Sequence, residues 1–167
     1  MKRIADMTRD ELEHEALTDP LTGIGNRRAF DEDEARAQAN IYAVLDMEGL
    51  KWINDGLGHA TGDALLKATA WALNRHRDIV SLAVKAYRIG GDEFVVRFGE
   101  LDEKLCVEWL DRLVAELPLI SYGIGQSIKE ADANLSFRRR LREMTGKQAR
   151  RGECPRNLAR VVEQEIG

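Results

Sequence analysis

Four apolar runs of strand length divide the chain, and polar segments separate them. These runs are Ile41–Met47, Ala86–Ile89, Phe94–Phe98 and Leu119–Gly125. The run Ile41–Met47 does not alternate between apolar and polar residues, which is typical of a strand covered on both faces. Gly90 and Gly91 join two of the runs, and they predict a β-hairpin with a type I′ turn, because both central residues of that turn need a positive φ.

Helical periodicity is found before and between these runs. Thr8 and Glu11 have the spacing of a capping box, which predicts a short helix that continues to Leu17. Asp19-Pro20 ends this pattern, since proline disfavours the helical conformation of the residue before it. The following segment, residues 21–28, contains two glycines and predicts a turn that leads into a second helix ending at about Asn40.

Two longer amphipathic helices are predicted over Ala64–Arg77 and Glu103–Leu117, and a further helix begins at Ala131. Trp71 and Cys106 are expected on the buried faces of the first two. From residue 138 to residue 160 the chain carries nine lysines and arginines against two glutamates. This basic segment is typical of a solvated helix face, and contacts with phosphate groups or with nucleic acid are the alternatives.

Three carboxylates fall at predicted strand ends. Asp46 ends the buried run, where a lone acid is costly unless it is paired, hydrogen-bonded or bound to a cation. Asp92 and Glu93 follow the glycine pair, whose missing Cβ atoms allow a ligand to approach the backbone closely. Because side chains alternate along a strand, these two acids are expected to point to opposite faces, so that one can hold a metal ion. A surface hairpin or a capping acid would account for the same residues without a ligand.

A turn and a short helix are predicted over residues 48–59. Lys51 lies five residues after Asp46, close enough to reach phosphate oxygens bound to the same metal ion. Asn54 and Asp63 suit the edge of a guanine, whose N1–H and N2–H₂ groups donate to a carboxylate while O6 and N3 accept from an amide. A turn residue at Asn54 and a helix cap at Asp63 are the structural alternatives.

Composition restricts the class of protein. A length of 167 residues predicts one domain with a hydrophobic core, and 44% hydrophobic with 32% charged residues is typical of a soluble globular protein. The formal net charge of −4 gives no general attraction to nucleic acid or anionic membranes. No apolar run approaches the roughly 20 residues of a membrane span, and no signal peptide is recognisable. Cys106 and Cys154 have no metal-ligand spacing, and a cytoplasmic location is the default expectation.

Longer motifs contain these single residues. They are Leu17-Thr-Asp-Pro-Leu-Thr-Gly-Ile-Gly-Asn-Arg-Arg-Ala-Phe30, Leu45-Asp-Met-Glu-Gly-Leu-Lys-Trp-Ile-Asn-Asp-Gly-Leu-Gly-His-Ala-Thr-Gly-Asp63, Arg88-Ile-Gly-Gly-Asp-Glu-Phe94 and Ser121-Tyr-Gly-Ile-Gly125, continued by Ala131-Asp132 and Leu135. In this order they make the chain resemble the GGDEF-domain diguanylate cyclases, which join two GTP molecules into cyclic di-GMP. The resemblance covers most of residues 17–139. It implies an α/β (α+β) palm-like fold with a central, largely antiparallel sheet flanked by helices, similar to adenylyl cyclase catalytic domains.

The resemblance also assigns roles to residues. The implied ligands of Mg²⁺ (or Mn²⁺) are Asp46, the carbonyl of Met47, Asp92 and Glu93. The implied nucleotide contacts are Gly49, Leu50 and Lys51 for phosphate, Asn54 and Asp63 for guanine, and Gly91 against the nucleotide. The implied catalytic group is Asp92, Glu93 and Lys51, with Glu93 as a second metal-facing or base-assisting acid. Mg²⁺ prefers hard oxygen ligands and would polarise the α-phosphate, help to ionise the attacking 3′-hydroxyl and screen the leaving pyrophosphate.

GTP and cyclic di-GMP are therefore the expected ligands. Each domain of this family holds one GTP, so the resemblance implies an antiparallel homodimer, at least a transient one. A sensor or receiver domain, which usually carries the dimerising helix, is expected to be missing from this chain. We expect residues 1–17 to form an N-terminal linker or helix, residues 18–160 the GGDEF domain and residues 161–167 a tail. No membrane contact is expected. Nucleic acid is disfavoured as a partner, because no RNA-binding module or helix-turn-helix accompanies the basic segment.

The sequence departs from the family pattern at three places. Glu48 replaces the usual aspartate two residues after Asp46. The positions of the Arg-x-x-Asp product-inhibition site hold Ser81 and Val84, and the same letters at Arg75-His-Arg-Asp78 are expected to form the end of a helix instead. Arg139 stands where the family has a phosphate-binding lysine. These departures leave a degenerate GGDEF domain, which binds GTP or cyclic di-GMP and regulates a partner, as the alternative function; a basic-tailed nucleic-acid adaptor is a third.

Overall fold

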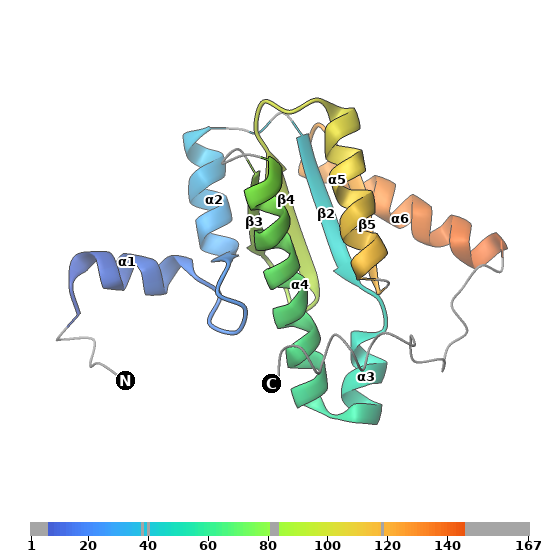
Figure 1. Ribbon diagram of the computed structural model, residues 1–167, viewed down its shortest axis with the longest axis horizontal. Helices are drawn as coiled ribbons and strands as arrows, with labels where there is room; N and C mark the ends of the chain where they lie inside the picture. Colours follow the sequence, from blue (N-terminus) through green and yellow to red (C-terminus); the bar gives the residue numbers. More distant parts are fainter. Residues whose placement is uncertain (1–6, 38, 40, 81–83, 118, 146–167) are drawn as a thin grey trace.

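A five-stranded sheet with the order β1-β3-β4-β2-β5 forms the centre of the protein (Figure 1). The computed structural model describes residues 7–37, 39, 41–80, 84–117 and 119–145. The strands are β1 (Gly25–Asn26), β2 (Ile41–Met47), β3 (Val84–Arg88), β4 (Glu93–Phe98) and β5 (Ile120–Gly125). All neighbouring strands pair antiparallel except β1 with β3, which confirms the predicted α/β fold with a largely antiparallel sheet.

Strand β2 is buried on both faces, as its continuous apolar run predicts. It pairs with β4 on one side and with β5 on the other. Its alternate side chains enter two separate clusters: Ala43, Leu45 and Met47 on one face, and Tyr42 and Val44 on the other. Both faces of β2 are covered by other elements, and Asp46 is therefore the first charged residue along the strand.

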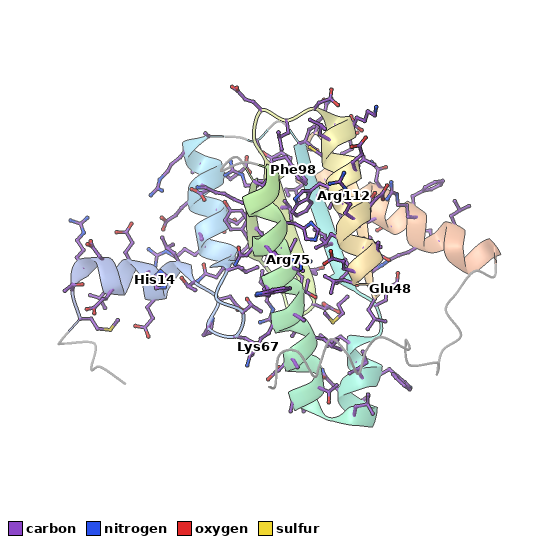
Figure 2. All side chains as sticks on the ribbon, in the orientation of Figure 1. His14, Glu48, Lys67, Arg75, Phe98 and Arg112 are labelled. Carbon is purple, nitrogen blue, oxygen red and sulfur yellow. The ribbon has the colours of Figure 1, made fainter. Side chains whose placement is uncertain are left out.

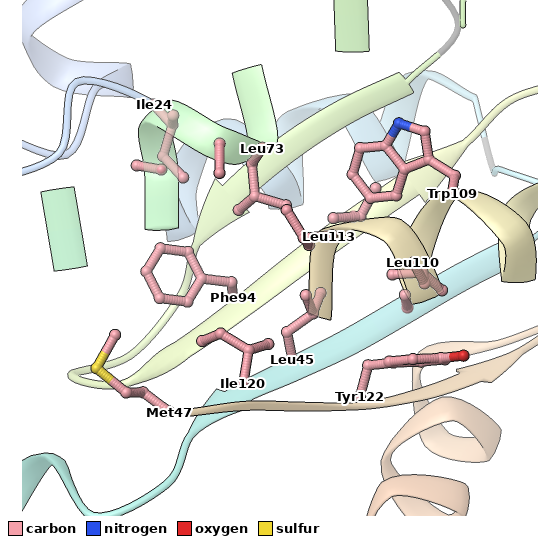
Figure 3. Packing of buried hydrophobic residues seen from close by; sticks show 14 of the residues in the cluster. Ile24, Leu45, Met47, Leu73, Phe94, Trp109, Leu110, Leu113, Ile120 and Tyr122 are labelled. Atoms are coloured by element: carbon pink, nitrogen blue, oxygen red, sulfur yellow. The ribbon is translucent and has the colours of Figure 1, made fainter. Parts of the chain in front are cut away.

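Helices cover the two faces of the sheet unequally (Figure 1). The helices are α1 (Arg9–Leu17), α2 (Arg27–Arg36), α3 (Leu50–Leu57), α4 (His59–Val80), α5 (Glu103–Glu116) and α6 (Ile128–Thr145). The larger cluster combines α3, α4 and α5 with one face of the sheet, and Figure 3 shows Leu73 of α4 and Leu113 of α5 packed toward Phe94 and Leu45. The smaller cluster joins α2 and α6 to the other face. No helix in the described residues is long and apolar enough to cross a bilayer.

Helix α6 lies on the sheet because β5 carries glycines beneath it. A Cβ atom at Gly123 would lie 2.1 Å from the carbonyl oxygen of Ala131 and 2.3 Å from the amide nitrogen of Leu135. Ala131 and Leu135 are buried and four residues apart, so they define the helix stripe that faces the sheet. Arg139 is the next residue of that stripe, and the helix therefore carries it toward the end of β2.

The β3–β4 hairpin is confirmed, but the type I′ turn was a wrong prediction. Positive φ values among the described glycines occur at Gly23, Gly49 and Gly58, and not at Gly90 or Gly91. The turn is instead closed by the amides of Ile89 and Gly90, which both donate to the carbonyl of Glu93 (3.0 and 3.4 Å). A Cβ at Gly90 would lie 2.7 Å from Oε2 of Glu93, so this glycine makes room for the folded-back carboxylate.

Helix α2 is shorter than predicted, because a tertiary contact ends it. It stops at Arg36 rather than near residue 40. Arg97 of β4 donates from its guanidinium to the carbonyl oxygens of Asp33 (3.3 Å) and Ala37, which satisfies the C-terminal end of the helix. The two-residue strand β1, which leads into α2, was not predicted; its length is too short for a periodic pattern.

The assignment of Trp71 to the core was wrong, whereas Cys106 is buried as predicted. Trp71 is 55% exposed. It lies four residues from both Lys67 and Arg75, which Figure 2 shows on α4, so all three share the solvent-facing stripe of that helix. The guanidinium of Arg75 stacks over the Trp71 ring at 4.7 Å from its centroid. The motif Arg75-His-Arg-Asp78 lies within α4, as expected.

Candidate functional site

Asp46 occupies the middle of a row of three residues on adjacent strands. The register places it opposite Glu93 of β4 on one side and opposite Ser121 of β5 on the other. Residues directly opposite each other in antiparallel strands point to the same face, which here is the face that carries α6. Because neighbouring strands lie about 4.8 Å apart, the sheet sets the backbones of these two acids side by side, while the Glu93 carboxylate is folded back toward Gly90.

Asp92 and Met47 complete this end of the sheet. The amide of Met47 donates to the carbonyl of Asp92 at 3.1 Å, which joins the hairpin turn to the end of β2. Asp92 is half-buried and Glu93 is exposed. In the described residues no group of three or more His, Cys, Asp or Glu side chains is placed to hold a metal ion. Two carboxylates nevertheless fit Mg²⁺, which keeps several waters and takes further oxygens from substrate phosphates.

A network that the sequence analysis did not identify fixes the turn from the other side. Arg88 donates to the carbonyl of Gly91 from Nη2 (2.7 Å) and Nε (3.3 Å), and from Nη1 to the carboxylate of Asp19 (3.1 Å). The backbone amide and the hydroxyl of Thr22 also donate to Asp19. Burial alone would raise the pKa of Asp19, but the hydrogen bonds from Thr22 and Arg88 and the charge of Arg88 lower it. Asp19 and Arg88 each belong to one of the sequence motifs given above, and the motifs could have indicated this pair.

Helix α3 begins directly after β2 and carries the predicted phosphate contacts. Gly49 is its N-cap with φ 77°, a conformation that favours glycine. Leu50 is buried and anchors the first turn, whereas Lys51 is exposed. The first amides of a helix have no partner within it, and they are favourable contacts for anions. The start of α3, with Gly49, Leu50 and Lys51, follows Asp46 closely in the chain. It therefore lies at the same end of the sheet as Asp46.

The predicted guanine contacts lie where α3 meets α4. A Cβ at Gly62 would lie 2.0 Å from Oδ1 of Asn54, so the glycine lets the amide of α3 lie against α4. This oxygen is buried and accepts no hydrogen bond from the described residues. An acceptor of this kind is costly unless a ligand or water donates to it. Asp63 follows Gly62 and is exposed; it lies inside α4, which begins at His59, so the structural alternative of a helix cap at Asp63 is wrong.

Two side chains cross to this end of the sheet from other elements. Arg139 of α6 donates to Oδ2 of Asp46 and forms an ion pair with it. The hydroxyl of Ser121 donates to Oε1 of Glu48, a residue that Figure 2 places where β2 ends. All the predicted site residues are therefore described by the structure, and they cluster at the ends of β2, β4 and β5 and on the adjoining helices. Most of the basic segment, from residue 146 to residue 160, lies outside the described residues.

The comparisons with known proteins agree with this geometry. The family model described as "Diguanylate cyclase, GGDEF domain" matches residues 16–136. The chain is 42% identical over 90 residues to diguanylate cyclase DgcN of Escherichia coli (strain K12), covering 48% of this chain and 21% of that protein. It is 33% identical over 134 residues to cyclic di-GMP phosphodiesterase PdeB of Shewanella oneidensis, covering 74% of this chain and 15% of that protein. The chain thus spans a minor part of the length of these curated relatives.

A solved structure supports the fold independently. The crystal structure of the coiled coil and GGDEF domain of DgcB from Caulobacter crescentus, in complex with c-di-GMP, superposes on this chain with a TM-score of 0.69. The two chains are 25% identical, and the superposition covers 79% of this chain and 85% of the other.

Proposed function

This chain belongs to the GGDEF family, and we propose from that membership that it is a diguanylate cyclase, which condenses two GTP molecules into cyclic di-GMP and releases two pyrophosphates. The observation that carries the proposal is the register of β2 and β4, which sets Asp46 opposite Glu93 beside the Gly-Gly-Asp-Glu turn. Acidic side chains on neighbouring strands at the open end of a sheet are suited to a divalent cation and a triphosphate.

The residues of this chain would divide the work as follows. Asp46, Asp92, Glu93 and the carbonyl of Met47 would hold Mg²⁺ or Mn²⁺, which supplies charge neutralisation at the α-phosphate and at the leaving pyrophosphate. The first amides of α3 and the Lys51 ammonium would bind the β- and γ-phosphates. Asn54 and Asp63 would read the guanine edge, and the buried Oδ1 of Asn54 without a described protein donor supports a ligand at this position.

The reaction needs two copies of the site. The 3′-hydroxyl of the GTP in one domain attacks the α-phosphate of the GTP in the other; a P–O bond to pyrophosphate breaks and the hydroxyl proton passes to solvent or to a carboxylate. A second, equivalent attack closes the ring. Catalysis is then mostly the positioning of two substrates, which is worth several powers of ten in rate. The homodimer, the sensor or receiver domain, the domain limits at residues 18 and 160 and the cytoplasmic location remain predictions.

The contact between Arg139 and Asp46 favours a second candidate function. An arginine that pairs with a proposed metal ligand competes with the cation for it, which would suit a GGDEF domain that binds GTP or cyclic di-GMP and regulates a partner. This candidate predicts nucleotide binding without turnover. The intact set of Asp46, Asp92 and Glu93 supports the cyclase instead.

The decisive experiment incubates the full chain with GTP and Mg²⁺ and measures cyclic di-GMP by liquid chromatography and mass spectrometry. Asp92→Ala should make no product, whereas Asp31→Ala, which removes an exposed acid on α2, should retain the activity of the wild type. Tight GTP binding by the wild type without product, at concentrations that permit dimerisation, would support the regulatory function. Equal product from Asp92→Ala would contradict the proposed metal site.

A further inference from the structure

We propose that Ser121 is a positioning residue of this site, which holds the carboxylate of Glu48 beside Asp46. The inference rests on the proposed function, because Asp46 is the proposed metal ligand. Neither Ser121 nor its bond to Glu48 has a role in the function proposed above. The proposal adds the carboxylate of Glu48, in the loop after β2 and held by Ser121 of β5, to the acids proposed for this site.

The position of Ser121 follows from the strand register. It lies opposite Asp46 in the β2–β5 ladder, and it is 2% exposed. Its hydroxyl points to the α6 face because opposite residues share a face. A buried hydroxyl needs an acceptor, and Oε1 of Glu48 accepts its hydrogen bond. Hydrogen bonds to an ionised acceptor are stronger than those between neutral groups, so this contact restricts the Glu48 side chain.

The backbone of Glu48 is fixed as well. Its amide donates to the carbonyl of Leu119 at 2.7 Å, and the preceding amide of Met47 donates to Asp92 at 3.1 Å. These bonds hold the chain against β5 on one side and against the hairpin turn on the other. With both its backbone and its carboxylate attached, Glu48 is bound to the β5 side of Asp46, while Glu93 stands on the β4 side.

The hydroxyl of Ser121 and the carboxylate of Glu48 act as a pair, because the buried hydroxyl donates to the carboxylate. Partners that orient the carboxylates around a metal ion typically change metal affinity by 10- to 100-fold when they are removed. We expect the loss of the Ser121 hydroxyl to weaken cation binding about tenfold.

The test measures Mn²⁺ binding to the full chain without nucleotide, by the electron paramagnetic resonance of free Mn²⁺. Ser121→Ala should bind Mn²⁺ about tenfold more weakly than the wild type, and Ser121→Thr, which keeps the hydroxyl, should restore most of the affinity. Ser136→Ala on α6 is the matched control and should bind like the wild type. In the double variant with Glu48→Gln, Ser121→Ala should add no further loss, because the carboxylate that it positions is gone.

Three outcomes would overturn the inference: Ser121→Ala binding Mn²⁺ as tightly as the wild type, losses that add in the double variant, or a wild-type chain that binds no Mn²⁺. Thermal melts of each variant separate a folding defect from a local one, since a general loss of structure by Ser121→Ala would lower the melting temperature and would add to the effect of Glu48→Gln. Assays of cyclic di-GMP keep the two proposals apart. Mn²⁺ binding with the expected pattern but no product would contradict the cyclase and leave the role of Ser121 intact.

Discussion

The guanidinium of Arg139 on α6 donates a hydrogen bond to the carboxylate of Asp46 on β2, and the two form an ion pair. Arg139 reaches this acid because it continues the helix stripe of Ala131 and Leu135, which packs on β5. The Asp46 side chain is largely buried, with 13% exposed, whereas 38% of the Arg139 side chain is exposed. One residue of α6 therefore neutralises a proposed metal ligand as long as no cation replaces it.

Arg139→Ala should consequently tighten the binding of Mn²⁺ measured without nucleotide, because the competing positive charge is gone. A partly exposed pair of this kind is worth about 1 kcal/mol, which corresponds to roughly a fivefold change in Kd. The KM for GTP should rise in the same variant if the arginine turns to the phosphates when substrate binds. Arg140→Ala, which removes the neighbouring exposed arginine, should leave both quantities unchanged. Weaker Mn²⁺ binding by Arg139→Ala would show that the pair supports the acid rather than competing for it.

Asp19→Asn should destabilise the fold and disturb the turn that carries Asp92, because Arg88 joins Asp19 to the carbonyl of Gly91. Charged hydrogen bonds are worth about 1.5–3 kcal/mol, so we expect a loss of about 2 kcal/mol in the free energy of unfolding, measured by urea denaturation at pH 7. The exposed pair of Arg27 and Asp31 provides a control, and Asp31→Asn should cost well under 1 kcal/mol.

The contribution of Asp19 should also depend on pH in a defined direction. Its pKa is lowered in the folded protein, so its stabilisation is fully present above the unfolded value of about 3.9 and is lost as the pH falls through the lower folded value. The difference between the wild type and Asp19→Asn in urea denaturation should therefore be constant from pH 7 to pH 5 and shrink in more acidic solution. A difference that grows on acidification would contradict this assignment.

Gly123→Ala should be strongly destabilising, because the new Cβ would lie 2.1–2.8 Å from the backbone of α6. Overpacking of this kind typically costs about 1–3 kcal/mol, and we expect the upper end because backbone atoms cannot rotate away. Gly56→Ala in α3 is the control: nothing lies within 4 Å of its Cβ, and alanine favours the helix by about 1 kcal/mol. Thermal denaturation of the two variants should move in opposite directions. If Gly123→Ala melted at the same temperature as Gly56→Ala, α6 would be able to shift on β5 without a loss of stability.

Asp63→Ala should reduce the discrimination between GTP and ITP, because inosine lacks the exocyclic amine that a carboxylate would accept from. The expected effect is about a tenfold rise of KM for GTP with a smaller change for ITP. Asp63 is exposed and lies within α4, so its removal should leave the melting temperature unchanged. Asp55→Ala, an exposed acid of α3, is the matched control. Unchanged discrimination in Asp63→Ala would remove this residue from the guanine site.

The elements that the sequence predicted well have a local cause. The continuous apolar run Ile41–Met47 indicated a strand covered on both faces, and the capping box of Thr8 and Glu11 is present at the start of α1. The errors come from contacts that one sequence does not display. Arg97, from a distant strand, ends α2, and Trp71 lies on the exposed stripe of α4 although the residue type favours burial.

In the candidate site, too, the sequence predicted the local features and missed the contacts between distant segments. Motif spacing identified Asp46, Asp92 and Glu93, but strand register decided that Asp46 stands opposite Glu93 and Ser121. The contacts of Arg88 with Asp19 and of Ser121 with Glu48 join segments far apart in the chain. Periodicity describes single segments, so it could not reveal these pairs. The Gly-Gly turn was predicted from backbone preference, whereas the structure uses Gly90 to admit a side chain.

The position of β5 beside β2 also determines when the site forms during synthesis. Strand β5 is the last strand to be synthesised, so a polypeptide that ends before it can align Asp46 with Glu93 while the other edge of β2 stays open. Pairings between distant segments form slowly, and an open strand edge invites other chains. Polypeptides terminated before residue 120 would therefore aggregate through this edge instead of accumulating as a folded domain that lacks only β5 and the residues after it.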